Sequence, residues 1–237
     1  MLRLENLSCG YGPMRAVHGL DLEVPRGSIA ALLGANGAGK SSTIMCLAGH
    51  VEVQAGRVVY LDQDITRRSP MDRVKAGLAV VPEGRRLFPR LTVRENLIVG
   101  GYSRPQEKTR PNLERVLSIF PRLEERQGQL AGQLSGGEQQ MLSIARALMP
   151  EPELLLVDEL SLGLMPKAID TCYEVITRLN KQGLTIILVE QSTQRALEVA
   201  HQVSVLESGR TVWQGAAEQA RRDAGLIDAY LGLHQER

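Results

Sequence analysis

The chain has 237 residues, 43% of them hydrophobic, which is enough for a substantial core in one large domain or in one domain with a subdomain. Its 28 Lys and Arg residues nearly balance its 27 Asp and Glu residues, so the formal net charge of +1 gives no reason to expect nucleic acid as a partner. The longest apolar runs are far shorter than the ~20 residues of a transmembrane helix, and the first residues lack the order of a signal peptide, so we expect a cytosolic chain.

The first part of the chain predicts strands that lead into a glycine-rich loop. Alternating apolar and polar residues predict strands over 2–7 and 17–24, and residues 9–13 between them predict a tight turn that carries Tyr11. The apolar run 29–33 predicts a buried strand, and residues 42–48 predict a helix. The segment between this strand and this helix fits the P-loop pattern G-x-x-x-x-G-K-[ST].

The P-loop predicts a site for a nucleoside triphosphate. It comprises Gly34, Ala35, Asn36, Gly37, Ala38, Gly39, Lys40, Ser41 and Ser42. Glycines let the backbone close around a polyphosphate, and N–H groups at a helix start face its charge. In this motif Lys40 would reach the β- and γ-phosphates, and the Ser41 hydroxyl would hold Mg²⁺. The loop alone does not indicate what work the nucleotide drives.

Further strands alternate with helices along the chain. The predicted strands are 57–61, 78–81, 154–157, 185–189, 203–206 and 210–213. The predicted helices are 70–77, 167–181, 193–200 and a tail at 216–230. The last two strands flank Ser208-Gly209, a hairpin signal. This alternation predicts a mostly parallel sheet that is covered on both faces.

A helical insertion interrupts this alternation between Pro82 and about Pro150. Capping boxes at Thr92-x-x-Glu95 and Ser135-x-x-Glu138 predict two helix starts, and residues 112–120 have helical periodicity. Two glycines follow Ser135, where each costs about 1 kcal/mol relative to alanine. A capping box does not require them, whereas close approach of an anion to bare N–H groups does.

Two acidic residues, Asp158 and Glu159, follow the apolar run 154–157. Ligands bind at the carboxyl ends of strands in a parallel sheet, so we expect both side chains near the P-loop. Asp158 suits the Mg²⁺ shell, and Glu159 can orient or deprotonate an attacking water. The alternative is a solvated acidic strand end.

The segment Leu134-Ser135-Gly136-Gly137-Glu138 resembles the L-S-G-G-[QE] signature of the ATP-binding cassette (ABC) ATPases. The order of the motifs also resembles that family over about residues 2–215. The resemblance implies one α/β ABC ATPase domain over 1–237, with a P-loop NTPase core and mostly parallel sheet, an antiparallel β subdomain and an inserted helical subdomain. Its implied parts are a nucleotide-binding core at 1–81 and 150–215, a helical signature subdomain at 82–149 and a C-terminal tail at 216–237.

The same resemblance implies how the site is completed. Two cassettes pair head to tail in this family, and ATP lies between the P-loop of one and the signature of the other. The implied signature contacts are Ser135, Gly136, Gly137 and Glu138. The resemblance also makes Tyr11 the aromatic that stacks on adenine, a type of contact worth ~1–3 kcal/mol.

Residues 82–97, 161–164 and 188–191 resemble the LivF-type ATPases of branched-chain amino acid importers. Such a chain would work at the cytoplasmic face of the inner membrane with two integral-membrane permease subunits and a second cassette, and indirectly with a periplasmic binding protein. Glu83 stands where most ABC ATPases have glutamine, and a carboxylate is a competent Mg²⁺ ligand. Gln191 replaces the usual histidine and can donate to the γ-phosphate but cannot act as a base, which leaves that role to Glu159.

Several alternatives remain open at this point. Leu160 and Met165 are less usual in the family, which leaves a weakly hydrolysing regulatory cassette as a rival. A non-transport ABC ATPase is a second rival, and a phosphoryl transferase, the third, does not account for residues 134–138. The cargo could be urea, an amide or another small polar solute, and the second cassette could be a copy of this chain or a paralogue.

Overall fold

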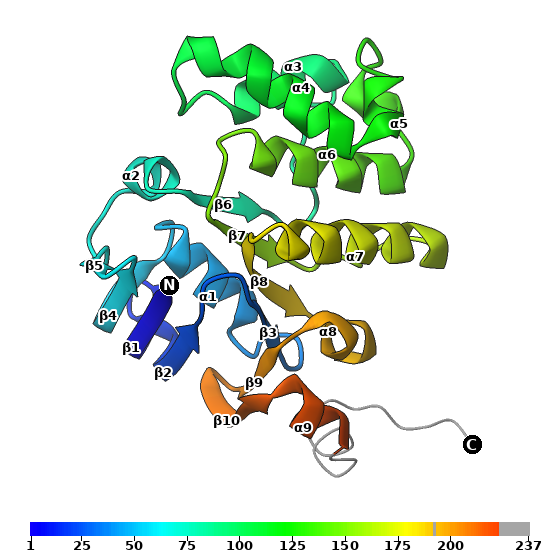
Figure 1. Cartoon of the computed structure of the whole chain (residues 1–237). Coiled ribbons are helices and arrows are strands. Elements are labelled where there is room, and N and C mark those ends of the chain that lie inside the picture. The colour runs from blue at the N-terminus through cyan, green and yellow to red at the C-terminus, as the bar shows by residue number, and fades with distance from the viewer. Residues whose placement is uncertain (192, 223–237) are drawn as a thin grey trace.

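The computed structural model describes residues 1–191 and 193–222, which form two β-sheets and a set of helices (Figure 1). The smaller sheet is antiparallel and has four strands in the order β2-β1-β4-β5. These strands are β1 (Leu2–Tyr11), β2 (Met14–Val24), β4 (Glu52–Tyr60) and β5 (Gln63–Asp64). This sheet is the antiparallel β subdomain that the resemblance implied.

The larger sheet has six strands in the order β10-β9-β3-β8-β7-β6. They are β3 (Ile29–Leu33), β6 (Leu78–Val81), β7 (Leu154–Asp158), β8 (Thr185–Glu190), β9 (Gln202–Glu207) and β10 (Arg210–Ala216). All neighbouring pairs are parallel except β9 and β10, which form an antiparallel hairpin. The predicted mostly parallel sheet and its terminal hairpin are therefore confirmed.

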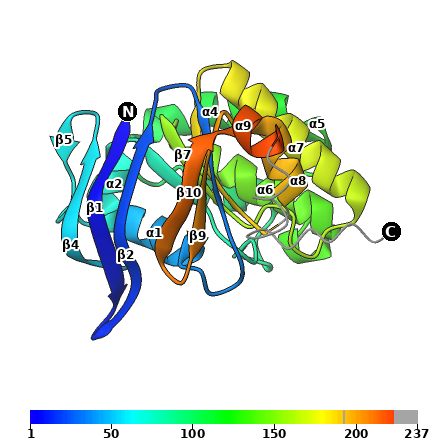
Figure 2. The same cartoon turned by 90° about the horizontal axis from the view of Figure 1, so that it is seen from below.

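The larger sheet separates two hydrophobic cores, as the apolar strands predicted. Along β3, Ala31 and Leu33 lie in one core with residues of the helices, while Ala30 and Leu32 lie in the other with residues of the antiparallel sheet. This alternation is the two-residue period of a strand whose two faces are both buried. Figure 2 shows the antiparallel sheet on one side and most of the helices on the other.

The helices fall into a set that packs on the sheet and a set inserted between β6 and β7. The first set is α1 (Lys40–Leu47), α2 (Pro70–Lys75), α7 (Pro166–Lys181), α8 (Thr193–Val199) and α9 (Ala217–Arg222). The inserted set is α3 (Val93–Gly100), η1 (Gln106–Lys108), α4 (Thr109–Ile119), α5 (Pro121–Glu124), η2 (Ala131–Gln133) and α6 (Gly136–Leu148). Both predicted capping boxes are present, at the starts of α3 and α6.

Several predicted boundaries differ from the structure, and the largest differences lie in β1 and β4. The predicted turn over residues 9–13 is mostly strand, because β1 continues to Tyr11 and pairs there with Met14 of β2. β4 begins at Glu52, five residues before the predicted strand at 57–61, because it pairs with the far end of β1. In both cases hydrogen bonds to neighbouring strands extend the backbone beyond what the apolar pattern predicts.

The C-terminal prediction is only partly covered. The helix α9 lies within the expected 216–230 segment, and residues 223–230 lie outside the described part of the chain. Within the residues that the structure describes, none of the helices is both long and apolar enough to cross a bilayer.

Candidate nucleotide-binding and hydrolysis site

The P-loop joins the carboxyl end of β3 to the first turn of α1. Gly39 caps α1 in a left-handed conformation, with φ 99°, and a Cβ there would lie 2.7 Å from the Ala16 carbonyl oxygen. The Lys40 side chain is buried, and its Nζ donates to the carbonyl oxygens of Gly34 (2.9 Å) and Ala35 (3.0 Å). The ammonium is therefore held across the loop, at the place where the motif puts phosphate.

Three carboxylates lie close enough to the Lys40 ammonium for their charges to act on it. Burial lowers the pKa of Lys40, and the charges of Glu159, Asp158 and Glu190 act in the opposite direction. A site with one buried ammonium and several carboxylates carries an excess of negative charge, which a further cation would balance. That charge distribution suits a nucleotide that arrives with a divalent cation.

The Ser41 and Asp158 side chains are in direct contact, so Asp158 lies beside the P-loop, where the sequence analysis expected it. The Ser41 hydroxyl at the start of α1 donates to Oδ1 of Asp158, the last residue of β7, at 2.9 Å. Burial raises the pKa of Asp158; the hydrogen bond from Ser41 lowers it, and the nearby charges of Glu83 and Glu159 raise it further. The structure therefore brings together two oxygen ligands, Ser41 and Asp158, and places Glu83 near enough for its charge to act on Asp158. Hydroxyl and carboxylate oxygens fit a hard cation such as Mg²⁺.

Glu159 leaves β7 in a left-handed backbone conformation, with φ 49°. Its N–H donates to the Val189 carbonyl oxygen in β8 at 2.9 Å, which fixes this turn against the neighbouring strand. Gln191 follows the last residue of β8 and is exposed. Since β8 lies between β3 and β7, Glu159 and Gln191 lie at the carboxyl ends of the strands, on the same side of the sheet as the P-loop.

Tyr11 lies at the end of β1, close to the chain segment that begins α1. Two residues before it, the Cys9 thiol donates to the Ser42 carbonyl oxygen at 3.8 Å. The Tyr11 side chain is 51% exposed, so its ring is accessible to a planar ligand. This placement is compatible with the stacking role that the resemblance implies.

The signature residues lie at the start of α6, in the inserted helical set. Ser135 caps the helix, and Gly136, Gly137 and Glu138 form its first turn. A Cβ on Gly137 would lie 2.8 Å from Cβ of Ala168 in α7, so packing of two helices is a second reason for that glycine. Among the described residues, no hydrogen bond or ion pair joins the signature to the P-loop.

The sequence analysis missed two supports of the site. The buried Glu190 carboxylate accepts hydrogen bonds from the Ser161 N–H (3.1 Å) and hydroxyl (2.9 Å), which ties the loop after β7 to the end of β8. The Gly209 N–H, in the β9–β10 turn, donates to the Ala38 carbonyl oxygen at 3.0 Å. An acidic residue at the end of an apolar strand was an available signal for Glu190, as it was for Asp158.

Known proteins resemble this chain in sequence over nearly its whole length. The sequence profile of the ABC transporter family matches residues 17–161. The chain is 44% identical to the high-affinity branched-chain amino acid transport ATP-binding protein BraG of Pseudomonas aeruginosa, over 98% of this chain and 100% of that protein. It is 36% identical to the probable branched-chain amino acid transport ATP-binding protein LivF of Archaeoglobus fulgidus, over 92% and 93% of the two chains.

Export proteins and solved structures are similar as well. The lipopolysaccharide export system ATP-binding protein LptB of Haemophilus influenzae is 30% identical, over 98% of this chain and 97% of that protein. A nucleotide-free ATP-binding cassette from an ABC transporter has the same fold, with a TM-score of 0.85 and 24% identity over 96% of this chain and 97% of that one. These likenesses confirm the cassette fold expected from the sequence.

Proposed function

This chain belongs to the ABC transporter family, and we propose that it is the ATP-hydrolysing subunit of an importer for branched-chain amino acids. As a member of that family it is an ATPase whose activity is coupled to transport. The cargo is supported by the 44% identity to BraG, which is named for branched-chain amino acid transport and exceeds the 35% identity to a Nod factor export ATP-binding protein of Paraburkholderia xenovorans. LivF, at 36%, is about as similar to this chain as that export protein. The import direction is supported by the resemblance of residues 82–97, 161–164 and 188–191 to the ATPases of importers. The single observation that supports hydrolysis best is the Ser41–Asp158 hydrogen bond beside the P-loop.

In the proposed reaction, the loop residues 34–42 bind the phosphates of ATP through backbone N–H groups and Lys40. A Mg²⁺ ion held by Ser41, Glu83 and Asp158 would supply charge neutralisation at the β- and γ-phosphates. Glu159 orients a water molecule and accepts its proton as the water oxygen attacks the γ-phosphorus and ADP leaves. Gln191 donates a hydrogen bond to the γ-phosphate through its amide.

The proposed site is completed by a second cassette. The signature residues Ser135 to Glu138 make no polar contact with the P-loop of their own chain, within the described part of the molecule. The N–H groups of Gly136 and Gly137 at the start of α6 suit an anion that another cassette presents. The Tyr11 ring would stack on the adenine of the ATP that this chain's own P-loop binds. The subunit composition of the purified complex would show whether the second cassette is a copy of this chain or a paralogue.

The segment 82–97 is proposed to pass the motion to two membrane permease subunits. Arg85 and Arg86 both have positive φ, and their carbonyl oxygens accept hydrogen bonds from Arg146 of α6 at 3.0 and 2.8 Å. The helix that starts at the signature is thereby linked to this loop. The proposed parts are a nucleotide-binding core at 1–81 and 150–215, a helical subdomain at 82–149 and a tail at 216–237, docked at the cytoplasmic face of the membrane.

Reconstitution tests the proposal. The full chain is co-expressed with candidate permease subunits from the same genome, and the purified complex is placed in proteoliposomes with a candidate periplasmic binding protein. Binding protein loaded with leucine, isoleucine or valine should stimulate ATP hydrolysis and drive uptake of the amino acid. Stimulation by urea or an amide instead would overturn the cargo, and hydrolysis without any response to a binding protein would favour an exporter or a non-transport ATPase.

A further inference from the structure

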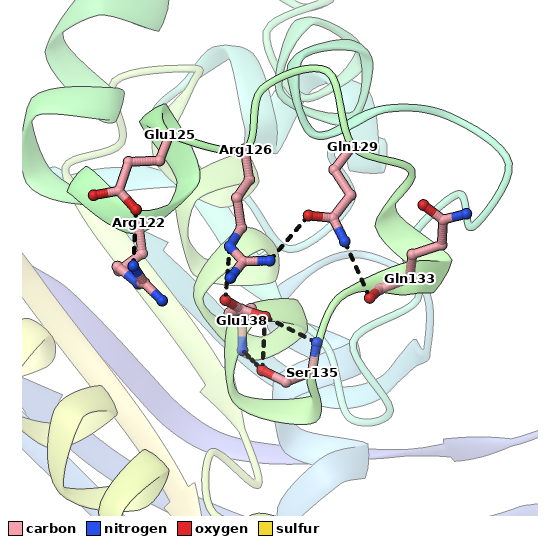
Figure 3. A network of polar contacts seen from close by, with 7 residues as sticks. All are labelled: Arg122, Glu125, Arg126, Gln129, Gln133, Ser135 and Glu138. Atoms are coloured by element: carbon pink, nitrogen blue, oxygen red, sulfur yellow. Dashed lines mark hydrogen bonds and ion pairs between the residues drawn. The ribbon is translucent and has the colours of Figure 1, made fainter.

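A network of hydrogen bonds and an ion pair fixes the side chain of Glu138, the last residue of the signature (Figure 3). Oε2 of Glu138 accepts hydrogen bonds from the Ser135 N–H at 3.0 Å and from the Ser135 hydroxyl at 2.8 Å. Oε1 of the same carboxylate lies 3.1 Å from Nε of Arg126, which follows α5. One carboxylate therefore joins the signature serine to a guanidinium from another part of the helical set.

Arg126 is itself held in place. Its NH1 donates to Oε1 of Gln129 at 3.0 Å, and Nε2 of Gln129 donates to the Gln133 carbonyl oxygen at 3.2 Å. The Arg126 and Glu138 side chains are 34% and 20% exposed, so their ion pair is partly shielded from water. Such shielding makes the charge interaction stronger than that of a fully exposed pair.

A neighbouring ion pair lacks these features. Arg122 of α5 pairs with Glu125 at 2.8 Å, and these side chains are 69% and 58% exposed. Figure 3 shows this pair beside the network, with no bond from Arg122 to Glu138. The charge of Arg122 still acts on Glu138, so the control for Arg126 comes from α4, where Arg110 pairs with Glu114 at 2.8 Å and both side chains are mostly exposed.

The charge of Glu138 raises a difficulty that Arg126 resolves. Partial burial raises the pKa of Glu138, but the hydrogen bonds from Ser135 and the charges of Arg126 and Arg122 outweigh it and hold that pKa below its usual range. The carboxylate is thus ionised at neutral pH, next to the position where the proposed function puts the γ-phosphate of a second cassette. Two negative groups at such a place repel each other unless a cation balances one of them.

The Ser135 hydroxyl has only one proton to donate. In this structure it goes to Glu138, so a bond from Ser135 to a phosphate oxygen requires that Glu138 lose this donor. The ion pair with Arg126 and the Ser135 N–H would remain to satisfy the carboxylate.

We propose that Arg126 is a positioning residue, whose guanidinium balances the Glu138 carboxylate and frees the Ser135 hydroxyl to donate to the γ-phosphate bound by a second cassette. This inference rests on the proposed function, in which two cassettes enclose ATP. It assigns a task in the reaction to a residue outside the signature, in the turn after α5.

The test compares the ATP hydrolysis of full-length Arg126→Gln with that of the wild type over a range of ATP concentrations. We expect KM for ATP in hydrolysis to rise about 5- to 10-fold, which corresponds to about 1–1.4 kcal/mol. Binding of a fluorescent ATP analogue to the dilute single cassette should change less than about twofold, because the P-loop is untouched. Arg126→Lys, which keeps the charge, should recover most of the loss.

Glu138→Gln provides the decisive background, because an amide carries no charge to balance. There, Arg126→Gln should change KM by less than about twofold, as should the control Arg110→Gln in the wild-type chain, because Arg110 pairs with Glu114 on an exposed face of α4. The inference is overturned if Arg126→Gln costs as much in the Glu138→Gln background, if it has no effect, or if its loss follows a fall in Tm. If the wild type itself hydrolyses no ATP, the proposed function fails, and this inference with it.

Discussion

The Ser41 hydroxyl donates a hydrogen bond to Oδ1 of Asp158 at 2.9 Å, although 117 positions separate the two residues in the chain. Ser41 belongs to the first turn of α1, and Asp158 ends β7. They meet because β8 alone separates β7 from β3, the strand that leads into the P-loop. The proposed cation site therefore depends on the strand order of the larger sheet.

Asp158→Asn is expected to stabilise the nucleotide-free protein at pH 7 while abolishing hydrolysis that depends on Mg²⁺. Burial raises the pKa of Asp158, so the folded state favours the protonated form, and ionisation of this group destabilises the fold. The asparagine variant avoids that cost, and Tm should rise by about 2–4 °C for each kcal/mol gained. Differential scanning calorimetry without nucleotide measures the change.

The pH dependence of the Tm increase in Asp158→Asn provides a second test of this explanation. Below the ordinary aspartate pKa of ~3.9 the side chain is neutral in both states, so the two proteins should have nearly equal Tm. The difference should grow as the pH rises from about 3.9 to the raised folded pKa and should be complete above it. A Tm advantage that is the same at every pH, or a lower Tm at pH 7, would contradict the assignment of a buried charge.

Glu159→Gln is expected to bind ATP and to lose about 10²–10⁴-fold in turnover, since the amide cannot accept the proton of the attacking water. ATP should then accumulate between two cassettes and trap a dimer, detected by light scattering during size exclusion. Glu151→Gln is a suitable control, because Glu151 shares the left-handed conformation, with φ 53°, before the opposite end of β7. Full steady-state hydrolysis by Glu159→Gln would remove the role given to this residue.

Gln191→Ala is expected to lower kcat while leaving nucleotide affinity nearly unchanged. The side chain is exposed beyond the end of β8, and the P-loop contacts of Lys40 do not involve it. Gln191→His, which keeps an N–H donor, should recover most of the rate. Steady-state kinetics together with titration of a fluorescent nucleotide separate the two quantities, and weaker binding at an intact rate would be the contrary result.

Gly137→Ala is expected to destabilise the packing of α6 against α7 by about 1–3 kcal/mol, because the new methyl group would lie 2.8 Å from Cβ of Ala168. Gly136→Ala is the matched control, since its Cβ would make only ordinary contacts, the nearest at 3.5 Å from Arg85. Adding Ala168→Gly to Gly137→Ala should recover part of the loss. Thermal unfolding of the variants checks this, and an unchanged Tm for Gly137→Ala would refute the packing role.

The sequence by itself determined the motifs that are contiguous in the chain. The P-loop, the capping box at Ser135 and the acids after 154–157 each depend on backbone conformation within a few residues, so their spacing predicts their local structure. The buried strands were predictable for a similar reason, because a strand covered on both faces is a continuous apolar run. The mostly parallel sheet followed from their alternation with helices.

Only the tertiary structure decided which distant residues meet. Three features depend on contacts between segments that are not adjacent in the sequence. They are the extent of β1 and β4, the close approach of Gly137 to Ala168, and the ion pair of Arg126 with Glu138. Contacts of this kind depend on how helices and strands pack, and a local pattern of residue types carries no information about the partner. The candidate site was therefore predictable as separate motifs, whereas its supporting contacts came from packing.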